Sequence, residues 1–253
     1  KGEKYIGAYV KDPQVGQHKG VMSFDLNSLY PHLIMQYNIS PEMLLPQTMP
    51  YNDNTIDEML SQQIDLSMLP DAKVARTPNG ALFRTKKQGF LPEMMQEMYN
   101  DRTIYKKKML TAKQQYEDTK DPKFLNDVSR FQNIQMARKI SLNSAYGAIG
   151  NEWFRYYDLK IAEGITTSGQ LSIRWIEKAL NGYLNKLLKS EGVDYVIASD
   201  TDSVYIRFDE LVSKVLSKRV DESEDSYRLR VVEFLNTIAQ EKIEPFIDKS
   251  YQN

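Results

Sequence analysis

Two acidic residues, Asp200 and Asp202, lie in the middle of the apolar stretch YVIASDTDSVYIRF, residues 195–208. Aliphatic and aromatic residues on both sides of the polar Asp-Thr-Asp-Ser core predict a β-hairpin that turns back at that core. Asp and Ser are frequent in turns, so a solvated turn is one interpretation of the pair. The other is a divalent metal site, because hard cations such as Mg²⁺ bind carboxylate oxygens. Further ligands elsewhere in the chain must decide between the two.

A third carboxylate, Asp25, closes the apolar stretch VMSF at residues 21–24. Taken alone, an Asp at the end of a strand is more often a helix cap or a turn residue than a ligand. Together with the pair at the hairpin tip, it fits a two-metal site for phosphoryl transfer, in which carboxylates on rigid strands bridge two Mg²⁺ ions about 4 Å apart. In such a site one metal lowers the pKa of an attacking hydroxyl group, and the other stabilises the leaving pyrophosphate.

A triphosphate substrate also needs cations, and two expected helices supply them. Arg102 and Lys106 are spaced i,i+4 and so share a helix face. In RKISLNSAYG, residues 138–147, one stripe is formed by Lys139, Asn143, Tyr146 and Gly147. A solvated, charged helical pair accounts for surface lysines such as Lys107. It does not account for a stripe that mixes Lys, Asn, Tyr and Gly, which suits contacts with phosphate and base and a close backbone approach.

The composition narrows the class of protein. With 253 residues, 41% hydrophobic and 26% charged, the chain has ordinary globular values and enough length for a sizeable core. It has no cysteine and only two histidines, His18 and His32, which excludes disulfide frameworks, thiolate zinc sites and histidine-rich metal sites. A net charge of −1 neither favours nor opposes nucleic acid as a partner. No apolar run reaches membrane-spanning length, so no membrane partner is expected.

The elements that position these residues are predicted from periodicity and turn residues. Strands are expected at residues 5–10 and 20–26, followed by a short helix after Pro31. Residues 46–90 look irregular, with TPNG at 77–80 as a turn between short strands. Helical patterns cover four further stretches, at 91–110, 125–145, 161–189 and 227–249. The first two of these helices are separated by the break KDPKF, so we expect them to pack as an antiparallel pair.

Three motifs resemble motifs A, B and C of family B DNA polymerases, in the family's order: DLNSLYP at 25–31, KISLNSAYG at 139–147 and SDTDS at 199–203. The flanks QYNISPE at 36–42 and GNEWFRYYDL at 150–159 are similar to the polymerases of T-even-like bacteriophages. The similarity covers nearly the whole chain. It implies a DNA-dependent DNA polymerase that transfers a nucleotide from a dNTP to a primer 3′-hydroxyl group on primer–template DNA, during phage DNA replication in the cytoplasm of the infected bacterial host.

The resemblance also implies an α+β fold, in which an antiparallel-sheet palm carries an inserted antiparallel two-helix fingers subdomain. The palm would comprise residues 1–90 and 147–253, and the fingers residues 91–146, with motif B at their end. The proofreading motif Asp-x-Glu, the motif Lys-Lys-Arg-Tyr after motif C and room for a thumb are all absent. The sequence opens at Lys1 and stops within a helical pattern, so we expect a piece of a longer protein, with the missing N- and C-terminal polymerase regions as partners.

By motif position, Asp25 and Asp202 would be the main catalytic carboxylates, with Asp200 as a nearby acidic helper. The metal set that the resemblance implies is Asp25, Leu26 and Asp202, holding two Mg²⁺ ions. Because Mg²⁺ binds weakly without substrate phosphates, both ions are expected only once a dNTP is bound.

The nucleotide-binding residues that the resemblance implies are Ser28, Leu29, Tyr30, Arg102, Lys106, Lys139, Asn143 and Tyr146. The three cations would hold the triphosphate, and Asn143 would support that end of the nucleotide. Backbone N–H groups of the first three residues would bind phosphate oxygens, as turns into helices do. Tyr30 would be the sugar gate, its ring filling the space that a ribose 2′-hydroxyl group needs. Tyr146 would pack beneath the nascent base pair. Plain core packing is the alternative for both tyrosines.

Two positions depart from the family pattern. Ala198-Ser199 stands where the family usually has Tyr-Gly, which adds a Cβ atom where the primer end should approach, and His32 stands where Ser is common. Two other functions stay open. One is a non-enzymatic fragment or split subunit that is active only with a partner chain supplying the thumb. The other is a different two-metal nucleotidyl transferase, such as a cyclase. A cyclase needs no fingers helices, so this function does not account for the stripe at Lys139.

Overall fold

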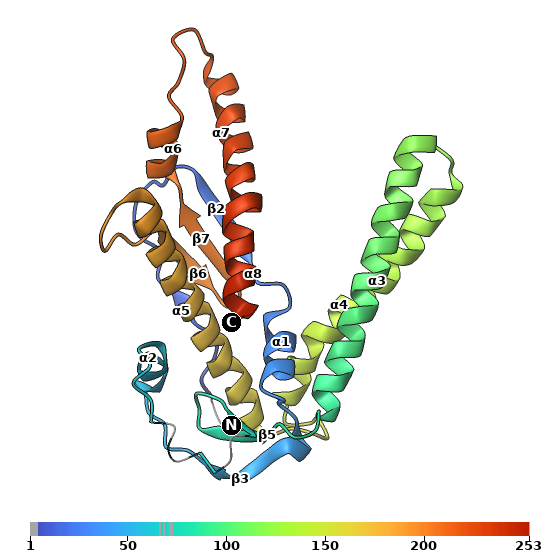
Figure 1. The fold of residues 1–253 in the computed structure, drawn as a ribbon. Helices are drawn as coiled ribbons and strands as arrows, with labels where there is room; N and C mark the ends of the chain where they lie inside the picture. Colours follow the sequence, from blue (N-terminus) through green and yellow to red (C-terminus); the bar gives the residue numbers. More distant parts are fainter. Residues whose placement is uncertain (1–4, 66, 68, 71–72, 253) are drawn as a thin grey trace. The chain divides into compact units, whose positions relative to one another are not determined.

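The structure, a computed structural model, describes residues 5–65, 67, 69–70 and 73–252 as long helices combined with two antiparallel sheets (Figure 1). The fold is therefore mixed α and β with antiparallel sheets, as expected. The chain forms two compact units, each assembled from segments far apart in the sequence. The first comprises the described residues of Lys1–Gly7 and Ser28–Gly169, and the second those of Ala8–Asn27 and Gln170–Asn253.

The first unit is mainly helical. Its helices are α1 (Leu29–Gln36), α2 (Thr55–Leu60), α3 (Phe90–Thr119), α4 (Lys123–Ile149) and the start of α5 (Leu159–Leu188), with a 3₁₀ turn at Pro41–Met43. A small sheet has the order β3-β5-β4, formed by β3 (Leu44–Thr48), β4 (Val74–Arg76) and β5 (Ala81–Arg84). A buried apolar cluster holds α1, β5, α3, α4 and α5 together, through side chains such as Ile34, Phe83, Met95, Leu142 and Ile165.

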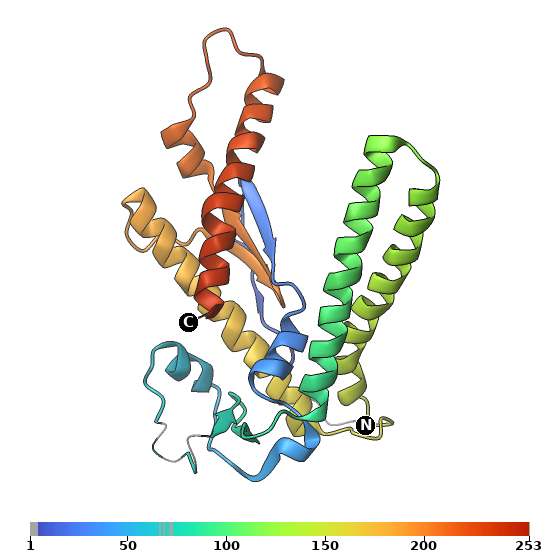
Figure 2. The ribbon, with the colours of Figure 1, turned by 45° about the vertical axis from the view of Figure 1, so that its right-hand side comes forward.

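The expected antiparallel helical pair is present as α3 and α4, which lie side by side in Figures 1 and 2. Both helices are longer than predicted. The break between them is short because Lys120 adopts a left-handed conformation with φ 55° and ends α3, and Pro122 then precedes the first turn of α4. An ion pair from Arg138 to Asp101, with 3.1 Å between Nη2 and Oδ2, joins the two helices.

The second unit is built on a four-stranded antiparallel sheet with the order β1-β6-β7-β2. Its strands are β1 (Val10–Lys11), β2 (Val21–Asp25), β6 (Val196–Asp200) and β7 (Ser203–Arg207). Its helices are the second part of α5, α6 (Asp209–Val215), α7 (Glu224–Ile238) and α8 (Glu244–Gln252), with a π-helical turn at Ala239–Ile243 between the last two. The predicted hairpin at 195–208 is confirmed as β6 and β7. The helix predicted at 227–249 is interrupted by the π-helical turn.

Two sequence predictions about local structure are wrong. The strand expected at 5–10 is limited to Val10–Lys11, because Ile6 makes its hydrogen bonds with α5 side chains: its N–H donates to Glu163 and its carbonyl oxygen accepts from Thr166. The stretch 46–90, expected to be irregular apart from short strands, contains the helix α2. This helix has only six residues, too few to show a 3.6-residue periodicity, and two acids in its first turn favour it through the helix dipole.

Among the helices that the structure describes, none is both long enough and apolar enough to span a membrane. Even α5, with 30 residues, carries charged side chains along its length.

Candidate active site

The three predicted carboxylates lie at one end of the four-stranded sheet. In the register of β2 with β7, Asp25 is opposite Ser203, and in the register of β6 with β7, Asp200 is opposite the same residue. The N–H of Leu26 donates to the carbonyl oxygen of Asp202 across 2.7 Å, which ties the end of β2 to the hairpin tip. Strand pairing thus brings Asp25 to the two acids that lie some 175 residues further along the chain.

The turn between Asp200 and Asp202 is strained and externally supported. Thr201 has φ 54°, a left-handed conformation that is unfavourable for a β-branched residue. Its N–H donates to the carbonyl oxygen of Tyr9 across 3.0 Å, and its hydroxyl group donates to the Asp200 carboxylate across 2.9 Å. The N–H of Asp202 donates to the carbonyl oxygen of Asp200 across 2.6 Å. The spacing of the two acids is therefore set by these contacts and by the chain just before β1.

The electrostatics of this end of the sheet favour a bound cation. Burial raises the pKa of the Asp202 carboxyl group above its ordinary value, and the negative charges of Asp25 and Asp200 raise it further. The described residues include no cluster of three or more His, Cys, Asp or Glu side chains suited to a metal ion. A Mg²⁺ ion has six oxygen ligands, so two or three carboxylates here fit it only if backbone carbonyl groups, water or substrate phosphates complete the shell. Leu26 could contribute only its backbone carbonyl oxygen, since its side chain is a buried hydrocarbon.

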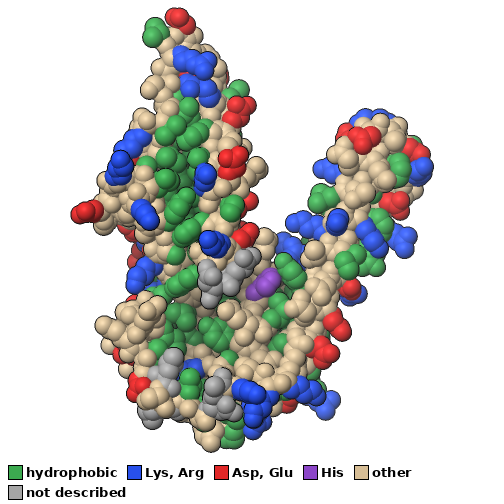
Figure 3. Space-filling view, in the orientation of Figure 1, with side chains coloured by type: hydrophobic (Ala, Val, Ile, Leu, Met, Phe, Trp, Pro, Cys, Tyr) green, Lys and Arg blue, Asp and Glu red, His purple; other side chains and the backbone are tan. Residues whose placement is uncertain are grey.

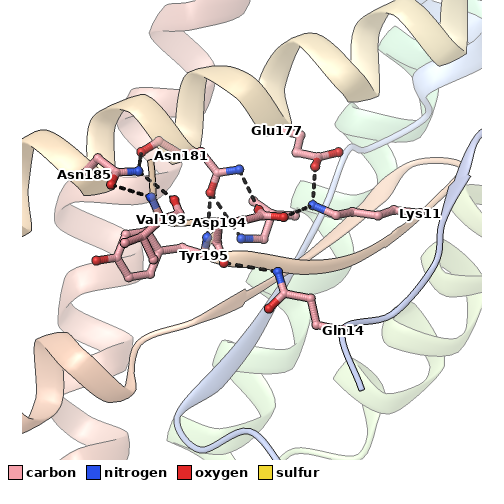
Figure 4. Close-up of polar contacts among 9 residues, drawn as sticks. Lys11, Gln14, Glu177, Asn181, Asn185, Val193, Asp194 and Tyr195 are labelled. Carbon is pink, nitrogen blue, oxygen red and sulfur yellow. Dashed lines mark hydrogen bonds and ion pairs between the residues drawn. The ribbon is translucent and has the colours of Figure 1, made fainter. Parts of the chain in front are cut away.

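A polar network that sequence reasoning missed holds β1 beside β6 (Figure 4). The Lys11 ammonium group forms ion pairs with Glu177 on α5 and with Asp194, the latter at 2.7 Å. Asn181 on α5 donates to Asp194 across 2.8 Å and accepts from the N–H of Tyr195 across 2.8 Å. Lys11 pairs with Ser199 in the register of the two strands, so the network braces the strand that ends in Asp200. No local pattern signals it, because the partners of Lys11 are more than 160 residues away.

In the first unit, the start of α1 meets α3 through Ser28 and Arg102. Ser28 adopts φ 56° at the N-terminal end of α1, and its hydroxyl oxygen accepts a hydrogen bond from Arg102 Nη1 across 3.1 Å. The Nε atom of Arg102 is buried and has no acceptor among the described residues. The first N–H groups of any helix have no acceptor within the helix, and so Leu29 and its neighbours present donors beside a cation.

The predicted stripe on α4 is largely exposed. Lys139, Asn143 and Gly147 are all exposed, while Leu142, which lies beside the stripe one turn before Tyr146, is 1% exposed and belongs to the core. Lys106 on α3 is exposed as well. Among the described residues, neither Lys106 nor Lys139 forms an ion pair, whereas cations elsewhere on the pair do. Figure 3 shows Lys and Arg side chains, mixed with acids, along the arm formed by the two helices.

The two predicted tyrosines are in contact. The rings of Tyr30 and Tyr146 pack edge to face, with 4.7 Å between their centroids. The hydroxyl group of Tyr146 shares a hydrogen bond of 2.8 Å with that of Tyr5, and burial raises the pKa of Tyr146 well above its ordinary value. The ring is therefore neutral at any physiological pH. Tyr5 was not predicted, because its position within an expected strand gave no sign of a partner on α4.

The two departures from the expected motif pattern, Ser199 and His32, differ in their hydrogen bonding. Ser199 is 1% exposed, and its hydroxyl group has no hydrogen-bond partner among the described residues. The imidazole Nδ1 of His32 lies 2.9 Å from the carbonyl oxygen of Ser28, and its ring packs edge to face on Tyr99 of α3 with 4.6 Å between centroids. His32 thus supports the same N-terminal turn of α1 that Arg102 contacts.

Comparison with known proteins matches the chain to one family. The family model described as DNA polymerase family B matches residues 1–225. The chain is 33% identical to a DNA-directed DNA polymerase of Escherichia phage RB69 over 295 residues and 32% identical to that of Enterobacteria phage T4 over 291 residues, and both alignments cover 99% of the chain. It is 32% identical over 214 residues to DNA polymerase beta of an African swine fever virus, an alignment that covers 80% of the chain. The chain spans 31% of the length of each phage protein.

Proposed function

Since the chain belongs to DNA polymerase family B, we propose that it is the catalytic core segment of a phage-type DNA-dependent DNA polymerase. The reaction is nucleotidyl transfer from a dNTP to the 3′-hydroxyl group of a primer paired with a template. The observation that carries the proposal is the convergence of Asp25, Asp200 and Asp202 at one end of an antiparallel sheet. The matched phage proteins, which are named DNA-directed DNA polymerases, support it over 99% of the chain.

In this proposal the sheet β1-β6-β7-β2 belongs to a palm comprising residues 1–90 and 147–253, and α3 and α4 form the fingers at residues 91–146. The Asp25 and Asp202 carboxylates, with the Leu26 carbonyl oxygen, hold two Mg²⁺ ions, and Asp200 adds negative charge nearby. When bound, the ions supply activation of the primer hydroxyl group and charge neutralisation on the phosphates. The rigid β2–β7–β6 ladder fixes the carboxylates before substrate arrives, so little reorganisation is needed at the moment of reaction.

The triphosphate binds to the first unit. Lys106 and Lys139 are exposed cations without an anionic partner among the described residues, and Arg102 has an unused buried donor beside Ser28. The N–H groups of Ser28, Leu29 and Tyr30 at the start of α1 add backbone donors. Asn143 lies one turn from Lys139 on the same exposed stripe and supports that end of the nucleotide.

Two tyrosines select the nucleotide. The ring of Tyr30 excludes a ribose 2′-hydroxyl group, and Tyr146 packs under the nascent base pair. Their edge-to-face contact makes them one unit, and the Tyr5 hydroxyl group holds the Tyr146 end of it. The Tyr146 hydroxyl group is protonated at neutral pH and can donate a hydrogen bond, and burial raises its pKa still further from that range.

The alternative within the same family is a subunit that works only when a partner chain completes it. The observation that favours this alternative is that the chain spans only 31% of the length of each phage relative. Affinity for duplex DNA comes mainly from Lys and Arg contacts with phosphate, and the net charge of −1 gives this chain no global attraction to DNA. On this view the neighbouring N- and C-terminal polymerase regions are partners, and the reaction takes place in the cytoplasm of the infected host.

The test is primer extension with the chain alone and with the flanking polymerase regions added, covalently or in trans. We expect negligible extension at physiological salt by the chain alone, and template-directed, Mg²⁺-dependent extension by the completed enzyme. A completed Asp25→Asn variant is the control, since it keeps the fold and removes one metal ligand. Extension that persists undiminished in Asp25→Asn, or a completed enzyme that binds primer–template yet never incorporates dNTP, would refute the proposal.

A further inference from the structure

The ring of Tyr30 lies directly against the backbone of α5 at Gly169. A Cβ atom on Gly169 would lie 2.7 Å from Cε1 of that ring, closer than any ordinary carbon contact, and 3.5 Å from Cδ1. Gly169 is buried, and Tyr30 and Gly169 belong to the same compact unit. The ring can therefore occupy its observed position only because residue 169 has no side chain.

Glycine in the middle of a long helix needs a reason, since alanine at the same site stabilises a helix. Gly169 lies inside α5, away from both ends, and its φ is not in the left-handed region. Backbone conformation thus gives no requirement for glycine there. The contact with Tyr30 does.

Tyr30 is one end of a row of three contacting tyrosines, Tyr30, Tyr146 and Tyr5, and a second glycine lies against the other end. A Cβ atom on Gly150, which follows α4, would lie 2.8 Å from the hydroxyl oxygen of Tyr5. Tyr5 is hydrogen-bonded to Tyr146, and Tyr146 packs on Tyr30. The row Tyr5–Tyr146–Tyr30 therefore meets a glycine backbone at both ends, so its rings have a defined position along the row.

We propose that Gly169 is a specificity-determining residue, because it provides the space that fixes the ring of Tyr30 at the position from which the ring selects deoxyribose over ribose. This inference rests on the proposed function, in which Tyr30 is the sugar gate. Replacing Gly169 by alanine forces the ring to move until the contact grows from 2.7 Å to at least 3.4 Å, a shift of about 0.7 Å. Gly169 acts only through Tyr30, so its effect must disappear when the ring is removed.

The experiment is a double-mutant cycle in the completed polymerase, using Gly169→Ala, Tyr30→Ala and the double variant. Single-nucleotide incorporation gives kcat and KM for a dNTP and for the matching NTP. Overpacking displaces neighbouring side chains, and here it moves the ring against which the sugar would bind. We therefore expect Gly169→Ala to raise the KM for dNTP about tenfold and to change the dNTP-to-NTP ratio of kcat/KM at least about fivefold. In the Tyr30→Ala background both effects should fall below about twofold.

Gly182→Ala is the matched control. It makes the same substitution in the same helix, at a position where a Cβ atom meets nothing within 4 Å, so the sugar ratio should stay at the parent value. A merely structural role for Gly169 would lower the fraction of active enzyme, and hence kcat for both sugars, while leaving KM and the ratio unchanged. That result, or equal effects in both Tyr30 backgrounds, would overturn the inference.

Thermal unfolding of the 253-residue chain supplies a readout without catalysis. Gly169→Ala should lower Tm, Gly182→Ala should not, and Tyr30→Ala should remove most of the cost of Gly169→Ala. A Gly169→Ala chain as stable as the parent would show that the methyl group fits and would refute the inference. A completed parent enzyme that incorporates no dNTP would refute the proposed function and this inference with it, whereas a working parent with an unchanged ratio in Gly169→Ala would refute this inference alone.

Discussion

The end of the four-stranded sheet and the α3–α4 pair both carry charged side chains that form no ion pair with any described residue. The charges have opposite signs, and the two regions fix their side chains in different ways. Asp25, Asp200 and Asp202 are fixed by strand pairing, by a strained turn and by backbone hydrogen bonds, so that like charges are crowded together. Lys106 and Lys139 stand exposed on helices and need no support beyond helical periodicity. Like charges held close together repel, so they require a rigid scaffold and a counter-ion. Exposed, hydrated charges are stable in water without a bound ligand.

The largest effect should come from removing one of the crowded acids. Asp202→Asn in the completed enzyme is expected to slow nucleotide incorporation at least about a thousandfold, because metal stabilisation of the reacting phosphate is worth several kcal/mol. Single-turnover incorporation measures it, with Asp221→Asn, an exposed acid in the segment before α7, as a silent control.

The same substitution should not destabilise the metal-free chain. The pKa of Asp202 is raised in the folded state, so folding disfavours its charged form, and this cost is present at neutral pH and disappears below the ordinary Asp pKa of 3.8. In a chelator at pH 7, Asp202→Asn should therefore unfold at the same temperature as the parent or higher. A lower Tm would show that the Asp202 carboxylate stabilises the fold. It would contradict the view that repulsion among Asp25, Asp200 and Asp202 destabilises the metal-free chain.

On the helical pair, Lys139 is proposed to hold the triphosphate. Lys139→Ala should then raise the barrier to incorporation by about 3 kcal/mol and slow the reaction roughly a hundredfold. Lys107→Ala, on another face of α3, should be nearly silent, although both side chains are exposed and equally charged. Single-turnover rates at saturating dNTP, together with the dNTP concentration dependence, separate binding from chemistry. Equal losses in the two variants would mean that the pair contributes only general charge.

The contrast between these regions also explains what the sequence could predict. The stripe at Lys139 and the pair Arg102–Lys106 depend on helical spacing, which is local, and the hairpin around Asp200 depends on two apolar runs that are adjacent in the chain. The proximity of Asp25 to that hairpin depends on the β2–β7 register, which no local pattern gives. It was predicted from chemistry, because three acids together fit a two-metal site, and from the resemblance in motif order. Both helices of the pair and the hairpin are confirmed by the structure.

Residues whose role depends on distant partners escaped prediction. Lys11 looks like an ordinary surface lysine until α5 brings Glu177 to it, and Gly169 looks like a weak point in a helix until the ring of Tyr30 is packed against it. The expected strand at 5–10 failed for a related reason. Alternating apolar residues predict extended chain, but whether that chain joins a sheet depends on which donors lie beside it, and here Glu163 and Thr166 take the hydrogen bonds of Ile6.

The next largest effect should come from the Lys11 network that supports β1 beside β6, and it should appear in the free energy of unfolding. Lys11→Met leaves Glu177, which is 15% exposed, without its cation, and a poorly hydrated, unpaired carboxylate destabilises the fold by about 2 kcal/mol. Urea unfolding of the chain measures this loss. Lys218→Met is the control, because the Lys218–Glu224 pair is more exposed and such pairs contribute under about 1 kcal/mol. If both variants lose the same stability, β1 is not braced by the Lys11 network.

The smallest effect should come from charge that is already balanced. Glu222 accepts two hydrogen bonds from Arg230, at 2.9 Å and 2.6 Å, and this contact lowers the pKa of Glu222 from 4.5 to about 2. The pKa of the Glu222 carboxyl group is lower in the folded state than in the unfolded state. The stabilisation from this contact is therefore complete above pH 4.5 and is lost as the pH falls toward 2. The Glu222 side chain is only 7% exposed beside Arg230, but its neighbours Asp221 and Ser223 are exposed, so water reaches the carboxylate once the arginine is gone. Arg230→Met should therefore lower Tm only slightly at pH 7, and the difference from the parent should shrink steadily between pH 4.5 and pH 2. A difference that stays constant over that range would assign the loss to packing of the arginine side chain, which lies over the Tyr227 ring, and would remove this pair as an example of balanced charge.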